Sequence, residues 1–77
     1  MIDNYIEEVR VSMGLSRKEL SSRSGVSYAL LNNLEHGRNQ LYNCSVRILL
    51  RIASALDTDP MQLLKFTIVI GSDPNRL

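Results

Sequence analysis

The chain of 77 residues lacks several features on which whole classes of protein depend. Its single cysteine, Cys44, excludes an internal disulfide and a cysteine-rich metal cluster, and favours a reduced thiol in a cytoplasmic protein. Tryptophan is absent, and three tyrosines with one phenylalanine leave the core to leucine, isoleucine and valine. The longest apolar run, near Phe66–Ile70, is far below the roughly 20 residues that span a bilayer. Because the N-terminal segment also lacks a signal-peptide pattern, we expect neither a membrane partner nor secretion.

Groups that carry catalysis or bind metals are scarce as well. His36 is the only histidine, and no cluster of His, Cys, Asp or Glu surrounds it, so no metal site is predicted. No Ser-His-Asp arrangement, paired carboxylates or glycine-rich phosphate loop is discernible, and a chain this short leaves little room for a substrate cleft. We therefore expect no enzyme activity, no cofactor and no small-molecule substrate.

The charge of the chain is nearly balanced at +1, but its distribution is uneven. Residues 10–51 contain seven Lys or Arg and two Glu, which gives them a net charge of +5. Residues 1–9 and 52–77 are net negative. A basic middle between acidic ends is typical of a surface that binds nucleic acid, although charged faces are more often simply solvated.

Start and stop signals divide the first 66 residues into five expected helices. Ser16 lies three residues before Glu19 in a capping-box pattern, and Ser27 repeats the N-cap role after a turn at Gly25. Gly37 supplies a left-handed stop after the second of these two helices. The other three expected helices begin at the N-caps Asp3, Ser45 and Asp59. The pattern predicts a compact all-α, five-helix domain over residues 1–66.

A change of character after residue 66 predicts a short C-terminal extension over residues 67–77. Thr67–Ile70 is β-branched throughout and prefers an extended strand, and Gly71–Asn75 breaks regular structure. This segment would either pair with a second chain or fold back onto its own core. For the pairing of two chains, the expected contact residues are Met61, Leu64, Phe66, Ile68 and Ile70.

Four spaced motifs, GLSRKEL (14–20), SGVS (24–27), LEHG (34–37) and LLRIASALDTDPMQLL (49–64), resemble the lambda-repressor/Cro-type helix–turn–helix family, often called Xre-like. The resemblance covers residues 6–64 and implies a homodimer that binds double-stranded DNA at a palindromic operator. It also implies that Arg10 and Glu35 form an ion pair between the first and third helices, with Arg10 near a phosphate. Leu30 departs from the small polar residue that the family often has nearby.

The exposed face of the expected helix 27–36 supplies the predicted base contacts. A helical wheel turns Leu31 and Leu34 toward the body of the protein, and residues near the start of the helix reach deepest into a major groove. Four residues are therefore predicted to contact base edges: Ser27, Tyr28, Ala29 and Asn33. Asn33 is the strongest of them, because its amide can donate to and accept from adenine, a contact worth about 1–3 kcal/mol of discrimination.

Phosphate contacts are expected on both sides of this helix. Arg17 stands where the resembled family often has a glutamine that reaches the DNA backbone, and it adds a charge. Arg38, Asn39 and Asn43 precede the helix capped by Ser45, whose N-terminus attracts anions. Arg10 completes the predicted phosphate-contacting set.

The sequence thus predicts a sequence-specific transcriptional regulator, a dimeric repressor. Two alternatives stay open. The chain could be an antitoxin, although only residues 67–77 are available to wrap a toxin. It could also be a protein-interaction module without DNA binding, which Tyr28, Leu30 and the low net charge favour.

Overall fold

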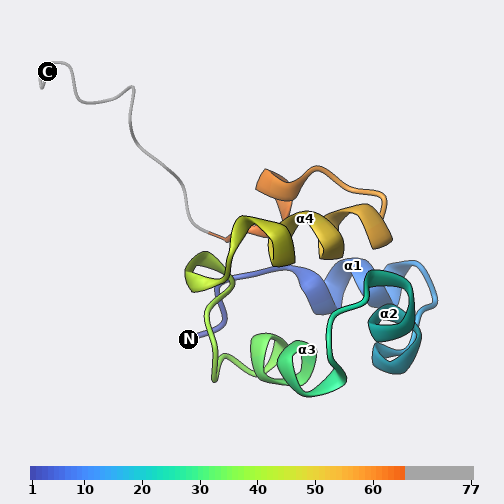
Figure 1. Cartoon of the computed structure of the whole chain (residues 1–77), viewed down its shortest axis with the longest axis horizontal. Coiled ribbons are helices and arrows are strands. Elements are labelled where there is room, and N and C mark those ends of the chain that lie inside the picture. The colour runs from blue at the N-terminus through green and yellow to red at the C-terminus, as the bar shows by residue number, and fades with distance from the viewer. Residues whose placement is uncertain (66–77) are drawn as a thin grey trace, which may run out of the picture.

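The computed structural model describes residues 1–65, which form four α-helices and two 3₁₀ turns (Figure 1). The helices are α1 (Ile6–Ser12), α2 (Arg17–Ser24), α3 (Tyr28–Glu35) and α4 (Val46–Ala55), and the 3₁₀ turns are η1 (Leu41–Asn43) and η2 (Pro60–Leu63). The all-α prediction is confirmed for this part of the chain, but the number of five helices is wrong. Within residues 1–65, no helix is both long and apolar enough to cross a bilayer.

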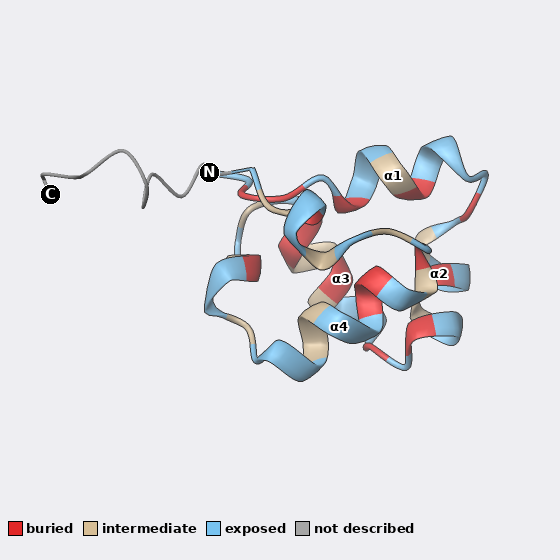
Figure 2. Cartoon of the chain, turned by 90° about the horizontal axis from the view of Figure 1, so that it is seen from above, coloured by how far each residue is buried: buried red, intermediate tan, exposed pale blue. Residues whose placement is uncertain are grey.

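Each element contributes to one apolar core, and the buried residues lie on the inward faces of the helices (Figure 2). Helix α2 packs against both α3 and α4, α1 packs against α3, and α4 packs against η2. The large aliphatic residues that are fully buried are Ile6, Leu20, Val26, Leu31, Leu34, Leu41, Ile52, Leu56 and Leu63. Since burying one such side chain stabilises the fold by about 1.5–3 kcal/mol, this shared core holds α3 in a fixed position.

The predicted N-caps of three helices are confirmed. The Ser16 hydroxyl accepts from the Glu19 N–H at 2.9 Å, and the Glu19 carboxylate accepts from the Ser16 N–H at 2.7 Å. Bonding to the Ser16 N–H holds the pKa of Glu19 below its usual value. Ser27 and Ser45 accept from the N–H groups three residues ahead, at 3.1 and 3.3 Å. Short-range signals therefore determine where α2, α3 and α4 begin.

The two predicted glycine turns on either side of α3 are also present. Gly25 adopts φ 71° between α2 and α3, and Gly37 adopts φ 76° after α3. A Cβ atom on Gly37 would lie 3.0 Å from the carbonyl carbon of Met1, because the N-terminal segment crosses at this point. Glycine at residue 37 thus serves both the left-handed backbone and a close approach of two chain segments.

The predicted N-cap role of Asp3 is wrong. Its carboxylate instead accepts from the backbone N–H groups of Leu41 and Tyr42 at 2.9 and 3.0 Å, and joins the N-terminus to η1. Burial raises the pKa of Asp3, but these two bonds and one from the Asn4 amide outweigh burial and leave the pKa below its usual value. Helix α1 begins later, at Ile6, whose N–H donates to the Asn4 side chain at 3.2 Å.

The predicted fifth helix is a single 3₁₀ turn. Asp59 does accept from the Met61 N–H at 2.8 Å, and Pro60 occupies the first position of the turn. The chain then becomes extended at Leu64, which forms an antiparallel bridge with Asn4. Backbone pairing with the N-terminal segment therefore replaces the next helical turn. The predicted strand Thr67–Ile70 and the rest of the predicted extension lie outside the described residues.

Candidate DNA interface

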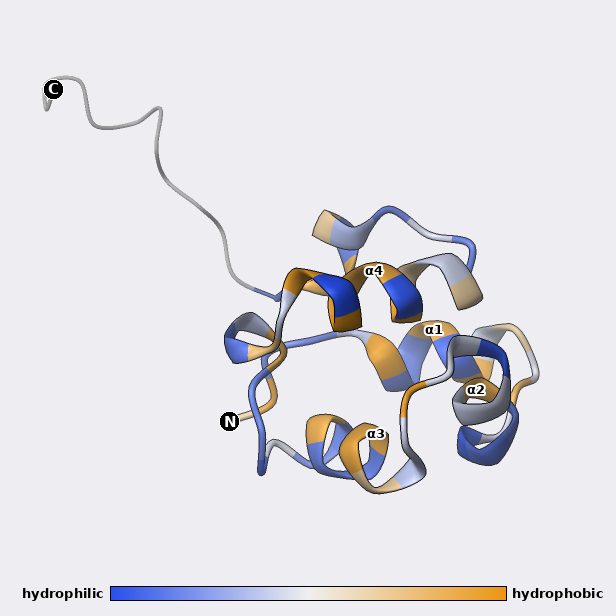
Figure 3. Cartoon of the chain, in the orientation of Figure 1, coloured by the Kyte–Doolittle hydropathy of each residue, from blue (hydrophilic) through white to orange (hydrophobic). Residues whose placement is uncertain are grey.

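Helix α3 presents its N-terminal end to solvent. Ser27, Tyr28 and Ala29 are exposed, and Asn33 is half-buried, whereas Leu31, Leu34 and Glu35 are buried. The inward face expected from the helical wheel is therefore confirmed, as is the exposure of Ala29, whereas Asn33 is half-buried at the edge of the outward face. Figure 3 shows that α3 combines a hydrophobic side with a hydrophilic one. Leu30 is half-buried and packs against the core, so it belongs to the hydrophobic side.

A buried ion pair joins α3 to α1. Arg10 donates from Nε to Glu35 Oε2 at 2.8 Å and from Nη2 to Oε1 at 3.0 Å. Its Nη1 donates to the Leu15 carbonyl at 2.8 Å. Arg10 is 8% exposed and Glu35 is 2% exposed. This two-pronged geometry fixes the relative rotation of α1 and α3 as well as their distance.

A second arginine shares the same carboxylate. Arg17 donates from Nε and Nη2 to Glu35 Oε1 at 3.1 and 3.0 Å, and from Nη1 to the Tyr28 hydroxyl at 3.2 Å. The Tyr28 hydroxyl and Glu35, in that order, raise the pKa of Arg17 against the effect of burial. Two arginines around one carboxylate leave an excess positive charge at this edge of α3. Glu35 thus connects α1, α2 and α3. Through Arg17 it also helps to position the Tyr28 hydroxyl.

These contacts distinguish the two arginines that were predicted to reach phosphates. All three nitrogens of the Arg10 guanidinium have protein partners, and the side chain is buried, so its observed role is to connect helices. Arg17 is more accessible, since its side chain is 21% exposed. Both arginines border a surface hollow of about 530 Å³, together with Ser16, Lys18 and Tyr28. Lys18 is an exposed cation there that the sequence pattern did not indicate as a phosphate contact.

The loop after α3 gathers the other predicted phosphate contacts. Arg38, Asn39 and Asn43 are exposed and surround a hollow of about 280 Å³. The backbone N–H groups of Arg38 and Asn39 donate to the Asn33 carbonyl at 2.9 and 3.2 Å. Arg38 Nη1 also lies 3.5 Å from Asn33 Oδ1. A base contact by Asn33 would replace this long hydrogen bond.

Among the described residues, His36 and Cys44 are the other side chains considered for metal binding or reactivity. The His36 ring Nδ1 lies 2.7 Å from the Asn32 carbonyl at the end of α3. Burial, and then the charge of Asp3, raise the pKa of the Cys44 thiol, which disfavours a reactive thiolate. Within residues 1–65, no group of three His, Cys, Asp or Glu side chains is placed to hold a metal ion.

Two capped helices joined by a tight turn, with a rigidly held second helix and basic groups on both sides of it, define a helix–turn–helix DNA-binding domain. The sequence model of the helix-turn-helix family HTH_3 matches residues 6–63, and the chain belongs to this family of DNA-binding regulators, which are not enzymes. The resemblance seen in the sequence is thereby confirmed.

A solved structure supports the same classification. The chain is similar to the restriction-modification controller protein C.AhdI from Aeromonas hydrophila, with 32% sequence identity and a TM-score of 0.68. The likeness covers 77% of this chain and 85% of the controller protein. No curated protein matches the chain.

Proposed function

We propose that the protein is a dimeric transcriptional repressor that inserts α3 into the major groove of each half of a palindromic operator. The observation that carries this proposal is the buried Glu35, which bonds Arg10 from α1 and Arg17 from α2. A reading helix must keep one orientation against the groove, and this three-helix connection supplies it. The exposed half of α3 then meets the DNA as a rigid surface.

Base contacts are assigned to Ser27, Tyr28, Ala29 and Asn33. Asn33 reads adenine through its amide, and the methyl group of Ala29 suits the methyl group of thymine. The Ser27 hydroxyl accepts from the Leu30 N–H, which leaves its own proton to donate. Tyr28 is 49% exposed, with its hydroxyl already oriented by Arg17.

Backbone contacts are assigned to Arg17, Arg38, Asn39 and Asn43, with Arg10 acting through its hold on Glu35. Arg17 precedes α3 and is partly buried, whereas Arg38, Asn39 and Asn43 follow α3 and are exposed. Each phosphate that a cation neutralises contributes about 0.9 to the slope of log affinity against log salt. Binding should therefore weaken steeply as the salt concentration rises.

The dimer contact is assigned to an apolar hollow of about 220 Å³ beside η2, which Met61 and Leu64 line together with Val46 and Leu49. Val46 is 69% exposed and Met61 is 57% exposed, although both are apolar. One patch used by both copies satisfies two-fold symmetry. The predicted contact residues Phe66, Ile68 and Ile70 follow Leu64 in sequence and would extend this contact, but they lie outside the described residues.

Substituting Met61→Glu tests the dimer. We expect the variant to sediment as a monomer at tens of micromolar, where the wild-type protein sediments as a dimer. Val11→Glu is the matched control, because Val11 is 59% exposed on α1 and does not line the hollow. A wild-type protein that is monomeric without DNA would contradict this part of the proposal.

Selection from a pool of random DNA duplexes tests the function as a whole. At about 150 mM salt, where exposed charges are screened within about 8 Å, the bound fraction should converge on one palindromic motif. Weak binding without sequence preference would reject the proposal and favour the protein-interaction module.

The likeness to a restriction-modification controller protein supports a second, narrower candidate: control of restriction and modification genes. The selected motif should then lie upstream of such genes in the source genome. A motif upstream of a small toxin gene would favour the antitoxin instead.

A further inference from the structure

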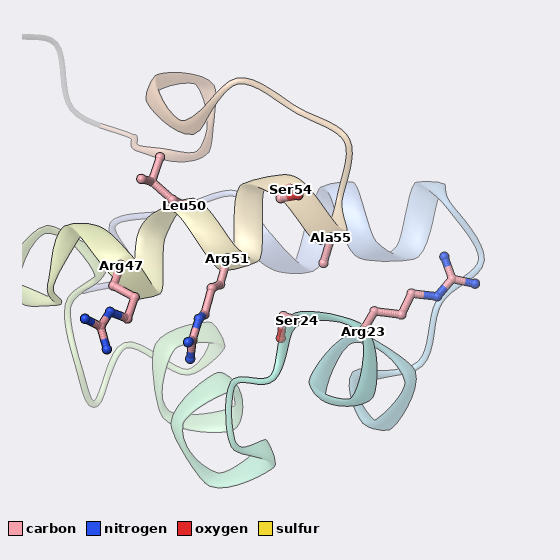
Figure 4. A pocket seen from close by; sticks show the side chains of 7 residues that line it. All are labelled: Arg23, Ser24, Arg47, Leu50, Arg51, Ser54 and Ala55. Carbon is pink, nitrogen blue, oxygen red and sulfur yellow. The ribbon is translucent and has the colours of Figure 1, made fainter.

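Two exposed arginines on α4 form a basic surface that none of the roles above uses. Arg47 and Arg51 border a hollow of about 730 Å³ between α4 and the end of α2. Both side chains extend from α4 toward the side on which the α2–α3 turn lies, whereas Arg23 extends away from them (Figure 4). Within residues 1–65, neither Arg47 nor Arg51 has a hydrogen bond or an ion pair with another side chain.

These two arginines do not stabilise the helix that carries them. They lie four residues apart, where like charges are neighbours and destabilise a helix by a few tenths of a kcal/mol. Arg47 is also in the first turn of α4, where the helix dipole disfavours a cation. No acidic residue occurs in α4, and among the described residues no carboxylate lines the hollow. An anion bound between the two side chains would reduce both the repulsion between them and the unfavourable interaction with the helix dipole.

Spacing and position indicate which anion fits. Four helical residues span about 6 Å along the axis. Along the duplex axis a DNA strand presents one phosphate for about every 3.4 Å, so phosphates two steps apart are separated by roughly 6.8 Å. Two flexible arginine side chains rooted about 6 Å apart can therefore reach two phosphates of a single strand. Ser24, which borders the hollow, ends α2 and is followed by the short turn into the reading helix α3. The hollow is therefore adjacent to the surface proposed to face DNA.

We infer that Arg47 and Arg51 bind phosphates of the DNA backbone, on the strand that passes the α2–α3 turn, outside the bases read by α3. This inference rests on the proposed function and extends it, because it enlarges the DNA contact from the helix–turn–helix unit to α4. The contact is to the backbone alone, so it strengthens binding to every sequence equally and adds no discrimination between bases.

The test compares Arg51→Gln with Lys65→Gln, both with the whole chain and the same duplexes. Each variant loses one positive charge, but Lys65 is engaged with Glu8 at 3.3 Å and with the Tyr5 ring. For Arg51→Gln we expect the salt slope to fall by about 0.9 for each lost contact, and each lost contact costs about eightfold in affinity at 0.1 M salt. Because the proposed dimer loses one contact in each half-site, the slope should fall by about 1.8 and the affinity by roughly 60-fold. The loss should be equal for a selected and a scrambled duplex. Lys65→Gln should change neither value.

Two further variants complete the test. Arg51→Lys should keep the wild-type salt slope, because a phosphate contact needs the charge rather than the forked shape of guanidinium. The double variant Arg47→Gln/Arg51→Gln should unfold at an equal or higher temperature than the wild type while it binds DNA more weakly. An Arg51→Gln salt slope equal to that of Lys65→Gln would overturn the inference, even if the wild-type protein selects a palindrome. Failure of the wild type to select any sequence would instead reject the proposed function.

Discussion

The arginines around α3 and those on α4 differ in one respect, the presence of a carboxylate. Arg10 and Arg17 share the buried Glu35, and together the three side chains connect α1, α2 and α3. Arg47 and Arg51 border an open hollow that no described carboxylate lines. The same residue type therefore positions the reading helix in one region and is available to an anionic ligand in the other. Substitutions should reduce stability in the first region and affinity alone in the second.

Removing the shared carboxylate has the largest expected effect. Glu35→Gln leaves two arginines without their counter-charge, one of them buried, and we expect a loss of about 3–5 kcal/mol in the free energy of unfolding. Unfolding in urea, followed by circular dichroism, measures this loss. Glu8→Gln is the control, because its pair with Lys65 is exposed and should contribute at most about 1 kcal/mol. Equal stability of the two variants would show that Glu35 does not hold α3 in place.

Loss of the proposed adenine contact has the second-largest expected effect. Asn33→Ala should weaken binding to the selected duplex by about 1–3 kcal/mol for each half-site, and leave binding to scrambled DNA unchanged. Fluorescence anisotropy titrations measure both affinities. The adjacent Asn32→Ala is the control, since the Asn32 side chain is not among the proposed base contacts. If both duplexes lose affinity equally, Asn33 does not read a base.

Substitution of Arg17 tests whether one arginine can both stabilise the fold and contact the DNA backbone. Arg17→Gln removes its bonds to Glu35 and to the Tyr28 hydroxyl, so we expect a loss of about 1–2 kcal/mol in stability. The salt slope of DNA binding should fall as well. Arg51→Gln provides the contrast, with a lower slope and unchanged stability. Identical behaviour of the two variants would remove the distinction between paired and unpaired arginines.

Acid sensitivity of the N-terminus is the smallest expected effect. The pKa of Asp3 is lowered on folding, so its carboxylate contributes stability above its ordinary pKa of 3.8 and loses it as the pH falls below that value. Asp3→Asn should cost about 1 kcal/mol at pH 7, roughly the value of one hydrogen bond. In urea unfolding at several pH values, the difference from wild type should shrink toward pH 3. A difference that is constant with pH would contradict the assigned bonds.

Sequence signals were sufficient wherever the determining contact is local. The S-x-x-E pattern at Ser16 and the serines at 27 and 45 identified helix starts, because each cap bonds an N–H three residues ahead. Asp3 and the fifth helix were assigned wrongly because their partners are remote. Asp3 bonds the backbone of Leu41, and Leu64 pairs with Asn4. Patterns within a short stretch of sequence cannot reveal such contacts between remote residues.

The candidate site was predictable to a similar degree. The exposed and buried faces of α3 followed from helical periodicity, and the pairing of Arg10 with Glu35 followed from family resemblance. The bond of Arg17 to the same carboxylate was missed, since it depends on how α2 packs against α3. Arg47 and Arg51 belong to the basic middle of the chain, but the charge count alone does not assign them a role. Their spacing of four residues within an amphipathic helix was the signal that could have identified them.

A change of specificity tests the central claim, that α3 reads base edges through Asn33. In Asn33→Arg, the new guanidinium should bond O6 and N7 of guanine in place of adenine. Selection from random duplexes with both proteins should then yield two palindromes that differ by guanine for adenine at one position in each half-site. Recovery of the same palindrome with both proteins would contradict the claim.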